Sequence, residues 1–285
     1  MIRTHARSLA LLFSAALTAC TAADNGNGND DTAATDPAPT AKNFGTFNFQ
    51  TQRQGSDSAQ VVAATFSNTS SDPSAGCSAP EISGSCAIRT CNVPSRSGGI
   101  TFAPLPAGEV SASVGATDVA LKETNGFWVA AQPVSWRPGD TLKGRASGAA
   151  GGAPAFDLEV KAPSIVAVSA PVFPGGIVPK PLAHAKSQDL KATWTDGTEG
   201  TVQLLLSTIG EDAALSIMCE APATAGELVV PAAVLARIPT PRAFMTLEGR
   251  AASVETKGDW LVGVISVAPA LDAQGREVKG FIELQ

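Results

Sequence analysis

Apolar and polar residues alternate with a period of two in several segments of this chain. Within residues 154–163, each of Phe156, Leu158 and Val160 is followed by a charged residue, which is the pattern of a strand with one buried and one solvated face. The same alternation recurs at Val62, Ala64 and Phe66, at Val110, Ala112 and Val114, at Leu142, Gly144 and Ala146, and at Leu215, Ile217 and Cys219. Long helical periodicities are missing, so the sequence predicts an all-β fold.

Other segments predict individual elements. Residues 190–195 and 201–206 also alternate, and the turn-forming segment 196–200 between them predicts a hairpin with a five-residue loop. Residues 260–267 are apolar on both faces, which predicts a central strand that is covered on both sides and ends at Pro269. A proline at each end favours one short helix over residues 231–237.

Turn signals fall at the spacing that β-sandwiches use. Arg137-Pro138-Gly139-Asp140 and Asn125-Gly126 both supply a residue that tolerates positive φ. The best boundary, Lys161-Ala162-Pro163-Ser164, separates residues 43–162 from residues 163–285. Each part is long enough for a seven-strand, immunoglobulin-like β-sandwich. We therefore expect two sandwich domains, with a single intertwined β-structure as the alternative.

The first twenty residues have the features of an export signal. Arg3 and Arg7 precede an apolar run over residues 9–19, which is too short to span a bilayer because a spanning helix needs about 20 apolar residues. The run ends in Leu17-Thr18-Ala19-Cys20, which resembles the lipobox of bacterial lipoproteins. The resemblance implies that residues 1–19 are a signal peptide and that Cys20 carries diacylglycerol as the first mature residue.

The resemblance also implies a location. In that family the amino group of the lipidated cysteine is commonly acylated as well, and two or three acyl chains, at about 0.8 kcal/mol for each buried methylene, hold a protein on a membrane. Thr21 follows Cys20 where an Asp would retain the protein, which implies transport to the outer membrane. Residues 20–42 contain no aromatic residue and no apolar residue larger than Ala after Cys20, so they are predicted to form a disordered tether.

The remaining cysteines suit an oxidising compartment. Cys77, Cys86, Cys91 and Cys219 are even in number, and two disulfides are expected. Sequence alone leaves three connectivities open, although the inward positions of Cys86 and Cys219 favour pairing them and hence Cys77 with Cys91. The spacings are not those of zinc sites, and no metal or other cofactor is expected.

Charge and residue usage restrict the function. Loss of residues 1–19 removes two arginines and no acid, which takes the formal net charge from −6 to −8 and argues against nucleic acid or anionic lipid as a partner. The mature chain keeps one histidine, His184, and has no tyrosine and no Gly-x-Ser-x-Gly motif. We therefore expect a protein that is not an enzyme.

A carboxylate-dependent hydrolase is the least favoured alternative. It would use Asp157 with Glu159, or Asp196 with Glu199. A solvated strand face and a turn are the plainer explanations for these two pairs.

The four tryptophans are possible recognition groups, because exposed aromatic rings stack on sugars or anchor protein interfaces. Trp194 and Trp260 lie on predicted strands with their rings inward, so we expect them in the core. Trp128 and Trp136 lie beside the two turns and are the candidate ligand-binding residues.

Residues 85–91, 136–140 and 219–239 resemble uncharacterised lipoproteins that predatory soil bacteria encode in many copies. That family has no established activity, so the resemblance supports the β-rich fold and the anchor only. The sequence favours a membrane-anchored, extracytoplasmic binding or adhesion module whose ligand is a glycan or a protein. The alternative is a structural or assembly lipoprotein that acts through a protein partner.

Overall fold

The structure, a computed structural model, describes residues 43–54, 57–69, 78–92, 102–174, 180–209 and 213–285. Within these residues nearly all regular structure is β-strand, with one short α-helix and one 3-10 helix, η1 (Ala223–Ala225). The predicted all-β class is confirmed. The predicted signal peptide, the lipidation site Cys20, the tether and Cys77 lie outside the described residues.

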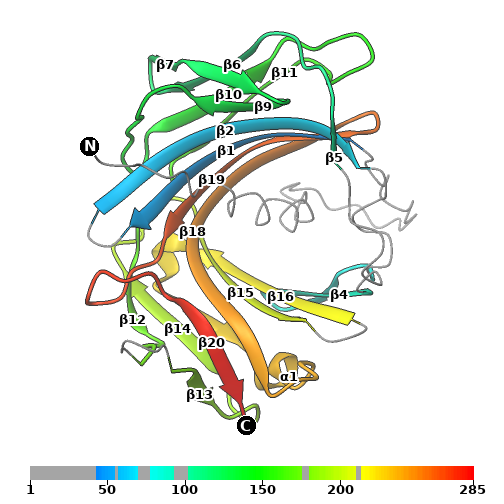
Figure 1. The fold of residues 1–285 in the computed structure, drawn as a ribbon. Helices are drawn as coiled ribbons and strands as arrows, with labels where there is room; N and C mark the ends of the chain where they lie inside the picture. The colour runs from blue at the N-terminus through cyan, green and yellow to red at the C-terminus, as the bar shows by residue number, and fades with distance from the viewer. Residues whose placement is uncertain (1–42, 55–56, 70–77, 93–101, 175–179, 210–212) are drawn as a thin grey trace, which may run out of the picture.

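Thirteen strands form one large sheet. They are β1 (Asn43–Gln54), β2 (Asp57–Thr69), β3 (Glu81–Ser83), β4 (Cys86–Asn92), β5 (Phe102–Pro104), β8 (Leu121–Thr124), β9 (Phe127–Ala130), β13 (Leu182–His184), β15 (Thr201–Ile209), β16 (Ala213–Pro222), β18 (Arg242–Lys257), β19 (Trp260–Pro269) and β20 (Lys279–Leu284). The order across the sheet is β3-β4-β16-β15-β18-β19-β1-β2-β9-β8, with β5 beside β2, β20 beside β18 and β13 beside β20. The sheet is strongly curved, and its concave face is visible in Figure 1.

Two smaller sheets lie on the convex side of the large one (Figure 1). One has the order β11-β10-β6-β7 and the other the order β12-β14-β17. Their bounds are β6 (Val110–Val114), β7 (Thr117–Val119), β10 (Thr141–Ala146), β11 (Phe156–Lys161), β12 (Ala167–Ala170), β14 (Leu190–Thr195) and β17 (Glu227–Val230). The concave face of the large sheet is therefore the face turned away from both smaller sheets.

A hydrophobic core fills the space under each smaller sheet. Under the four-stranded sheet, the rings of Phe47 and Phe66 lie 5.9 and 6.1 Å from that of Phe156. Under the three-stranded sheet, Leu204 and Trp194 belong to a second buried cluster. The alternation predicted for both sets of strands points the apolar residues into these cores, and the solvated residues outward.

Strand β19 is the central strand that the sequence predicts. It lies between antiparallel β18 and parallel β1, all but one of its residues are buried, and it ends at Pro269. Strand β1 belongs to residues 43–162, whereas β19 belongs to residues 163–285. The core under the four-stranded sheet, here the first core, therefore also contains Trp260 from residues 163–285. The second core contains Ile88 from residues 43–162. The division into two domains stays a prediction.

One predicted disulfide is confirmed. Cys86 on β4 and Cys219 on β16 are direct cross-strand neighbours, joined by a bond of 2.08 Å between their sulfur atoms. Cys91 is also disulfide-bonded, while Cys77, the partner expected for it, lies outside the described residues. The Cys86–Cys219 bond attaches the β3–β4 hairpin to the rest of the large sheet.

The predicted hairpin over residues 190–206 is wrong. Strand β14 pairs with β12 and β17, whereas β15 pairs with β16 and β18. The two strands face each other across the second core, and facing strands show the same inward alternation as neighbouring ones. The connecting loop is packed tightly at Gly197, where an added Cβ would lie 2.1 Å from the carbonyl oxygen of Ala223.

The predicted short helix is confirmed as α1 (Ala232–Leu235), which begins after Pro231. The side chain of Asp189 accepts a hydrogen bond of 2.8 Å from the backbone N–H of Ala232, which satisfies one of the free donors at the helix start. Val234 and Leu235 are buried in the second core.

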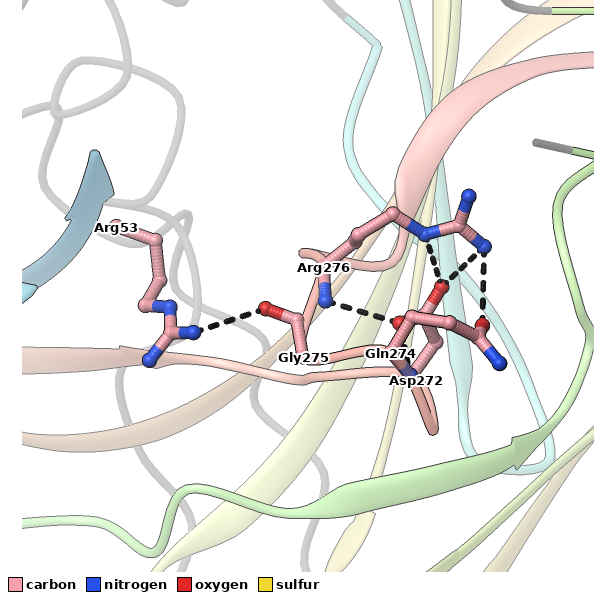
Figure 2. A network of polar contacts seen from close by, with 5 residues as sticks. All are labelled: Arg53, Asp272, Gln274, Gly275 and Arg276. Carbon is pink, nitrogen blue, oxygen red and sulfur yellow. Dashed lines mark hydrogen bonds and ion pairs between the residues drawn. The ribbon is translucent and has the colours of Figure 1, made fainter. Parts of the chain in front are cut away.

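The loop between β19 and β20 is fixed by a polar network (Figure 2). Asp272 accepts hydrogen bonds of 2.9 Å from the backbone N–H groups of Gln274 and Arg276, and its carboxylate lies 2.6 Å from the Arg276 guanidinium. Arg53, at the end of β1, donates a hydrogen bond of 3.2 Å to the carbonyl of Gly275. The network therefore ties this loop to a strand more than 200 residues away in sequence.

Candidate binding site

The candidate site begins with the Asn-Gly turn between β8 and β9. Asn125 and Gly126 have φ values of 53° and 80°, and they form a two-residue loop because Thr124 pairs with Phe127. This is the turn geometry for which Asn-Gly is the favoured sequence. A Cβ at Gly126 would lie 2.2 Å from Pro104 Cβ, so only glycine allows the tip of the hairpin to rest on Pro104.

The hairpin places Glu123 and Trp128 side by side. They are paired in register across β8 and β9, and residues opposed in this way lie on one face of the sheet with Cβ atoms about 4.5–5.5 Å apart. The Trp128 ring packs edge-on against Phe66, with ring centroids 5.2 Å apart and planes at 86°. Phe66 is fully buried, so the core orients the indole while part of it stays accessible.

Both side chains line a surface hollow of about 620 Å³. The described residues that line it are 104–108, Glu123, Asn125, Gly126, Trp128 and Ala149. The hollow lies at the end of the first core, between the tip of the β8–β9 hairpin and the loops that flank β6 and β10.

The loops that form the far wall of the hollow are bonded to each other. The backbone N–H of Gly148 donates to the carbonyl of Ala107 at 3.0 Å, and that of Ala153 donates to Pro106 at 2.8 Å. The hydroxyl of Ser147 accepts a hydrogen bond of 2.8 Å from the N–H of Glu109. These bonds hold the wall in one conformation, and a preformed wall loses little entropy when a ligand binds.

The hollow offers an aromatic surface and two polar side chains. Trp128 is half-buried, whereas Glu123 and Asn125 are exposed. Within the part of the chain that the structure describes, no residue makes a hydrogen bond with the side-chain polar atoms of these three residues. They are therefore available to a ligand in the described structure.

Trp136, the other candidate of the sequence, lies in the core. It is 8 % exposed and packs edge-on against Phe49, with ring centroids 5.8 Å apart. The following turn has the predicted form, because Gly139 has φ of 86° and the N–H of Asp140 donates to the carbonyl of Arg137 at 3.1 Å. Trp136 is not one of the residues that line the hollow, so the structure does not bring the two candidates together.

The other tryptophans and His184 have structural surroundings. Trp194 and Trp260 are buried, as predicted, and Trp194 donates a hydrogen bond of 2.7 Å to the carbonyl of Ala223. A ring nitrogen of half-buried His184 lies 3.1 Å from the carbonyl oxygen of Gln188.

The carboxylate pairs named for a hydrolase lie apart from the hollow. Asp157 and Glu159 are on the exposed face of β11, where Asp157 forms an ion pair with Lys143 at 2.9 Å. Asp196 and Glu199 lie in the loop that carries the chain from the three-stranded sheet to the large one. The structure places neither pair among the residues that line the hollow.

Sequence reasoning missed a row of polar side chains on the concave face. Glu220, Gln203 and Glu248 are in register on β16, β15 and β18. Gln203 donates to the Glu220 carboxylate, which also lies 3.4 Å from the Arg250 guanidinium. Burial raises the pKa of the Glu248 carboxyl, the Arg250 charge opposes this shift, and the Glu220 charge adds to it.

Two aromatic rings are exposed on the same face. Phe244 on β18 and Phe281 on β20 are cross-strand neighbours, 37 % and 52 % exposed, with ring centroids 5.4 Å apart. The Arg242 guanidinium lies 5.5 Å from the Phe281 centroid and 2.8 Å from the Glu283 carboxylate. The signal in the sequence that could have identified this pair is an apolar residue at a position where the alternation of each strand places the side chain outward.

Among the described residues, no helix has the length and apolar character needed to cross a membrane. Within the same ranges, His, Cys, Asp and Glu side chains do not gather in groups of three or more that could hold a metal ion.

Comparison of the chain with protein-family models, with curated proteins and with solved structures finds no match.

Proposed function

We propose that this protein is a lipid-anchored binding module of the cell envelope, and that the hollow beside Trp128 receives its ligand. The observation that carries the proposal is the pairing of Trp128 with Glu123 on one face of the β8–β9 hairpin. A partly accessible indole contributes apolar contact area, and a neighbouring carboxylate fixes the orientation of a polar ligand.

The anchor part of the proposal rests on the amino-terminal sequence. Leu17-Thr18-Ala19-Cys20 resembles a lipobox, and the polar residues that follow suit a tether. Lipid on Cys20 would hold the binding module at the outer membrane, on its periplasmic or its surface side. Palmitate labelling of the parent and of Cys20→Ser tests this part, because only the parent should incorporate label and partition into detergent.

The binding part is tested with an array of glycans and envelope proteins. The soluble chain should recognise at least one class of ligand, and Trp128→Ala should lose that signal. Trp194→Phe serves as a control for general damage to the fold, because Trp194 is buried in the second core and is not among the residues that line the hollow. An array that stays blank for the parent chain would count against a binding module.

A second candidate function, assembly through a constant protein partner, is favoured by the exposed pair Phe244 and Phe281. Exposed neighbouring aromatic rings beside an arginine are typical of the centre of a protein interface. A photo-crosslinking residue placed at Phe281 in intact envelopes tests this candidate. One constant partner would support it, and the same residue placed at exposed Lys122 is the control.

We also propose that residues 43–162 and 163–285 correspond to two immunoglobulin-like sandwiches that share the large sheet. The two separate cores support this division, whereas the pairing of β1 with β19 couples the two parts. Thermal unfolding of the whole chain distinguishes the alternatives, because separable domains would unfold in two transitions and an intertwined structure in one.

A further inference from the structure

The charge of the described lining disfavours one class of ligand. Among the described residues that line the hollow, Glu123 is the one charged side chain, and no lysine or arginine is in that set. An anionic ligand would face the Glu123 carboxylate without a compensating cation from these residues. The hollow therefore favours a neutral or a cationic ligand.

The number of aromatic rings in the hollow distinguishes between a neutral and a cationic ligand. Sites that recognise alkylated ammonium groups surround the cation with several aromatic rings, whereas Trp128 is the one aromatic residue among the described lining residues. The walls opposite the indole are formed by the prolines and small residues of segment 104–108 and by Ala149. One ring with a polar rim fits a flat ligand that carries hydroxyl groups at its edge.

A pyranose ring is such a ligand. Its C–H face can lie on the apolar surface of the Trp128 indole. Its hydroxyl groups can donate to the Glu123 carboxylate and exchange hydrogen bonds with the Asn125 amide. The fixed neighbourhood of Glu123 and Trp128 across the hairpin brings both kinds of contact to one sugar unit.

The volume and the fixed wall set the size of the ligand. At about 620 Å³ the hollow is within the range of sites for small molecules, which corresponds to a short run of sugar units. The hydrogen bonds between segments 104–109 and 147–153 keep the wall in place without a ligand. A preformed surface of this kind can bind a short run of sugar units without first folding around it.

We infer that the hollow beside Trp128 binds a neutral oligosaccharide, with Trp128 as the stacking platform and Glu123 and Asn125 as hydrogen-bonding partners. This inference rests on the proposed binding function and names the class of its ligand.

The experiment uses the whole mature chain with Cys20→Ser. Because this variant carries no lipid, it needs no detergent, and no sugar headgroup of a detergent competes with the probes. Calorimetric titration and tryptophan fluorescence are measured with cellotetraose, mannotetraose and tetra-N-acetylchitotetraose as neutral probes. Tetragalacturonate, the deacetylated chitosan tetramer and decaproline are the anionic, cationic and peptide probes. The variants are Trp128→Ala, Trp128→Phe, Glu123→Gln and Glu123→Ala, with Glu159→Ala, on the exposed face of β11 and outside the lining of the hollow, as the matched carboxylate control.

At least one neutral probe should bind more tightly than every charged probe. Trp128→Ala should weaken this binding at least about tenfold, and Trp128→Phe should restore part of it, because a smaller ring still stacks. Glu123→Ala should weaken binding severalfold, whereas Glu123→Gln should stay within about threefold of the parent because a neutral ligand needs a partner and not a charge. Glu159→Ala should bind as the parent does.

Three results would overturn the inference. Preferred binding of the chitosan tetramer that Glu123→Gln abolishes would mean a cationic ligand. Binding of decaproline alone, lost in Trp128→Ala, would make the site a peptide site and leave the proposed binding function intact. Silence with all six probes removes the saccharide class, and the binding function falls with it only if the wider ligand array is blank as well.

Discussion

Phe47 on β1 occupies the space that a side chain at Gly144 on β10 would need: a Cβ at Gly144 would lie 2.4 Å from Phe47 Cγ. Phe47 is fully buried, and its ring contacts Phe66 and Phe156 in the same core. The two sheets around the first core therefore approach closely where one strand presents a phenylalanine and the facing strand a glycine.

Gly144→Ala is expected to destabilise the protein through this contact. The added methyl group must displace Phe47, and overpacking of this kind costs about 1–3 kcal/mol. Chemical denaturation measures the free energy of unfolding. Arg145→Ala, at the neighbouring exposed position of β10, should change it by less than about 0.5 kcal/mol. Equal stability of Gly144→Ala and the parent would contradict the close packing.

Glu248→Gln is expected to stabilise the protein at neutral pH. Because burial, opposed by Arg250 and reinforced by Glu220, raises the folded-state pKa of Glu248, the folded state binds the proton more tightly than the unfolded state. Stability is then full below the unfolded pKa of about 4.3 and falls as pH rises through the folded value. Denaturation midpoints from pH 4 to 8 should separate the variant from the parent only at the higher pH. Exposed Glu159→Gln should show no such separation.

Asp272→Asn is expected to act in the opposite sense. Although burial raises the pKa of Asp272, its hydrogen bonds from Arg276 and Gln274 together with the Arg276 charge hold that pKa below the usual value. The stabilisation is present above the unfolded pKa of about 3.9 and is lost as pH falls through the folded value. The variant should lose about 1–3 kcal/mol at pH 7 and approach the parent in strong acid. A pH-independent gap would argue against a role for the charge.

Removal of the Cys86–Cys219 disulfide is expected to lower stability substantially. The bond joins residues 133 apart in sequence, and closure of a loop of that length is worth at most about 5 kcal/mol in the chain-entropy model. Cys86→Ala with Cys219→Ala should therefore cost about 2–5 kcal/mol. Amide hydrogen exchange should accelerate in β4, which the bond attaches to the sheet, and stay slow in central β19. Unchanged exchange in β4 would mean that strand pairing alone holds the hairpin.

Local features of the fold could be predicted because neighbours in sequence decide them. The period of two places Phe156, Leu158 and Val160 inward on β11, and the apolar run ending at Pro269 becomes central β19. Asn125-Gly126 adopts positive φ at both residues, so the turn that positions Trp128 was readable from two letters. The inward positions of Cys86 and Cys219 favoured their pairing among three possible connectivities, and the structure shows this disulfide.

Only some of the residues of the site could be predicted from the sequence. Trp128 and Trp136 both lie beside turns, yet Trp136 packs against Phe49 in the core while Trp128 lines the hollow. The sequence did not identify Glu123 as a site residue, because its pairing with Trp128 depends on the register of the hairpin. Segment 104–108 and Ala149 join the hollow through hydrogen bonds between loops that are some 40 residues apart.

Residues close together in the sequence determined eight strands with their inward faces, namely β2, β6, β10, β11, β14, β15, β16 and β19, together with the tight turns. The partners of these strands depend on the tertiary structure: β14 faces β15 across a core instead of pairing with it, and β1 joins β19 from the far end of the chain. The reason is that a period of two shows which side chains of a strand face the core, and it carries no information about which strand lies beside it. Strand pairing depends on the summed packing of segments hundreds of residues apart, and this packing leaves both Glu248 and Trp128 half-buried.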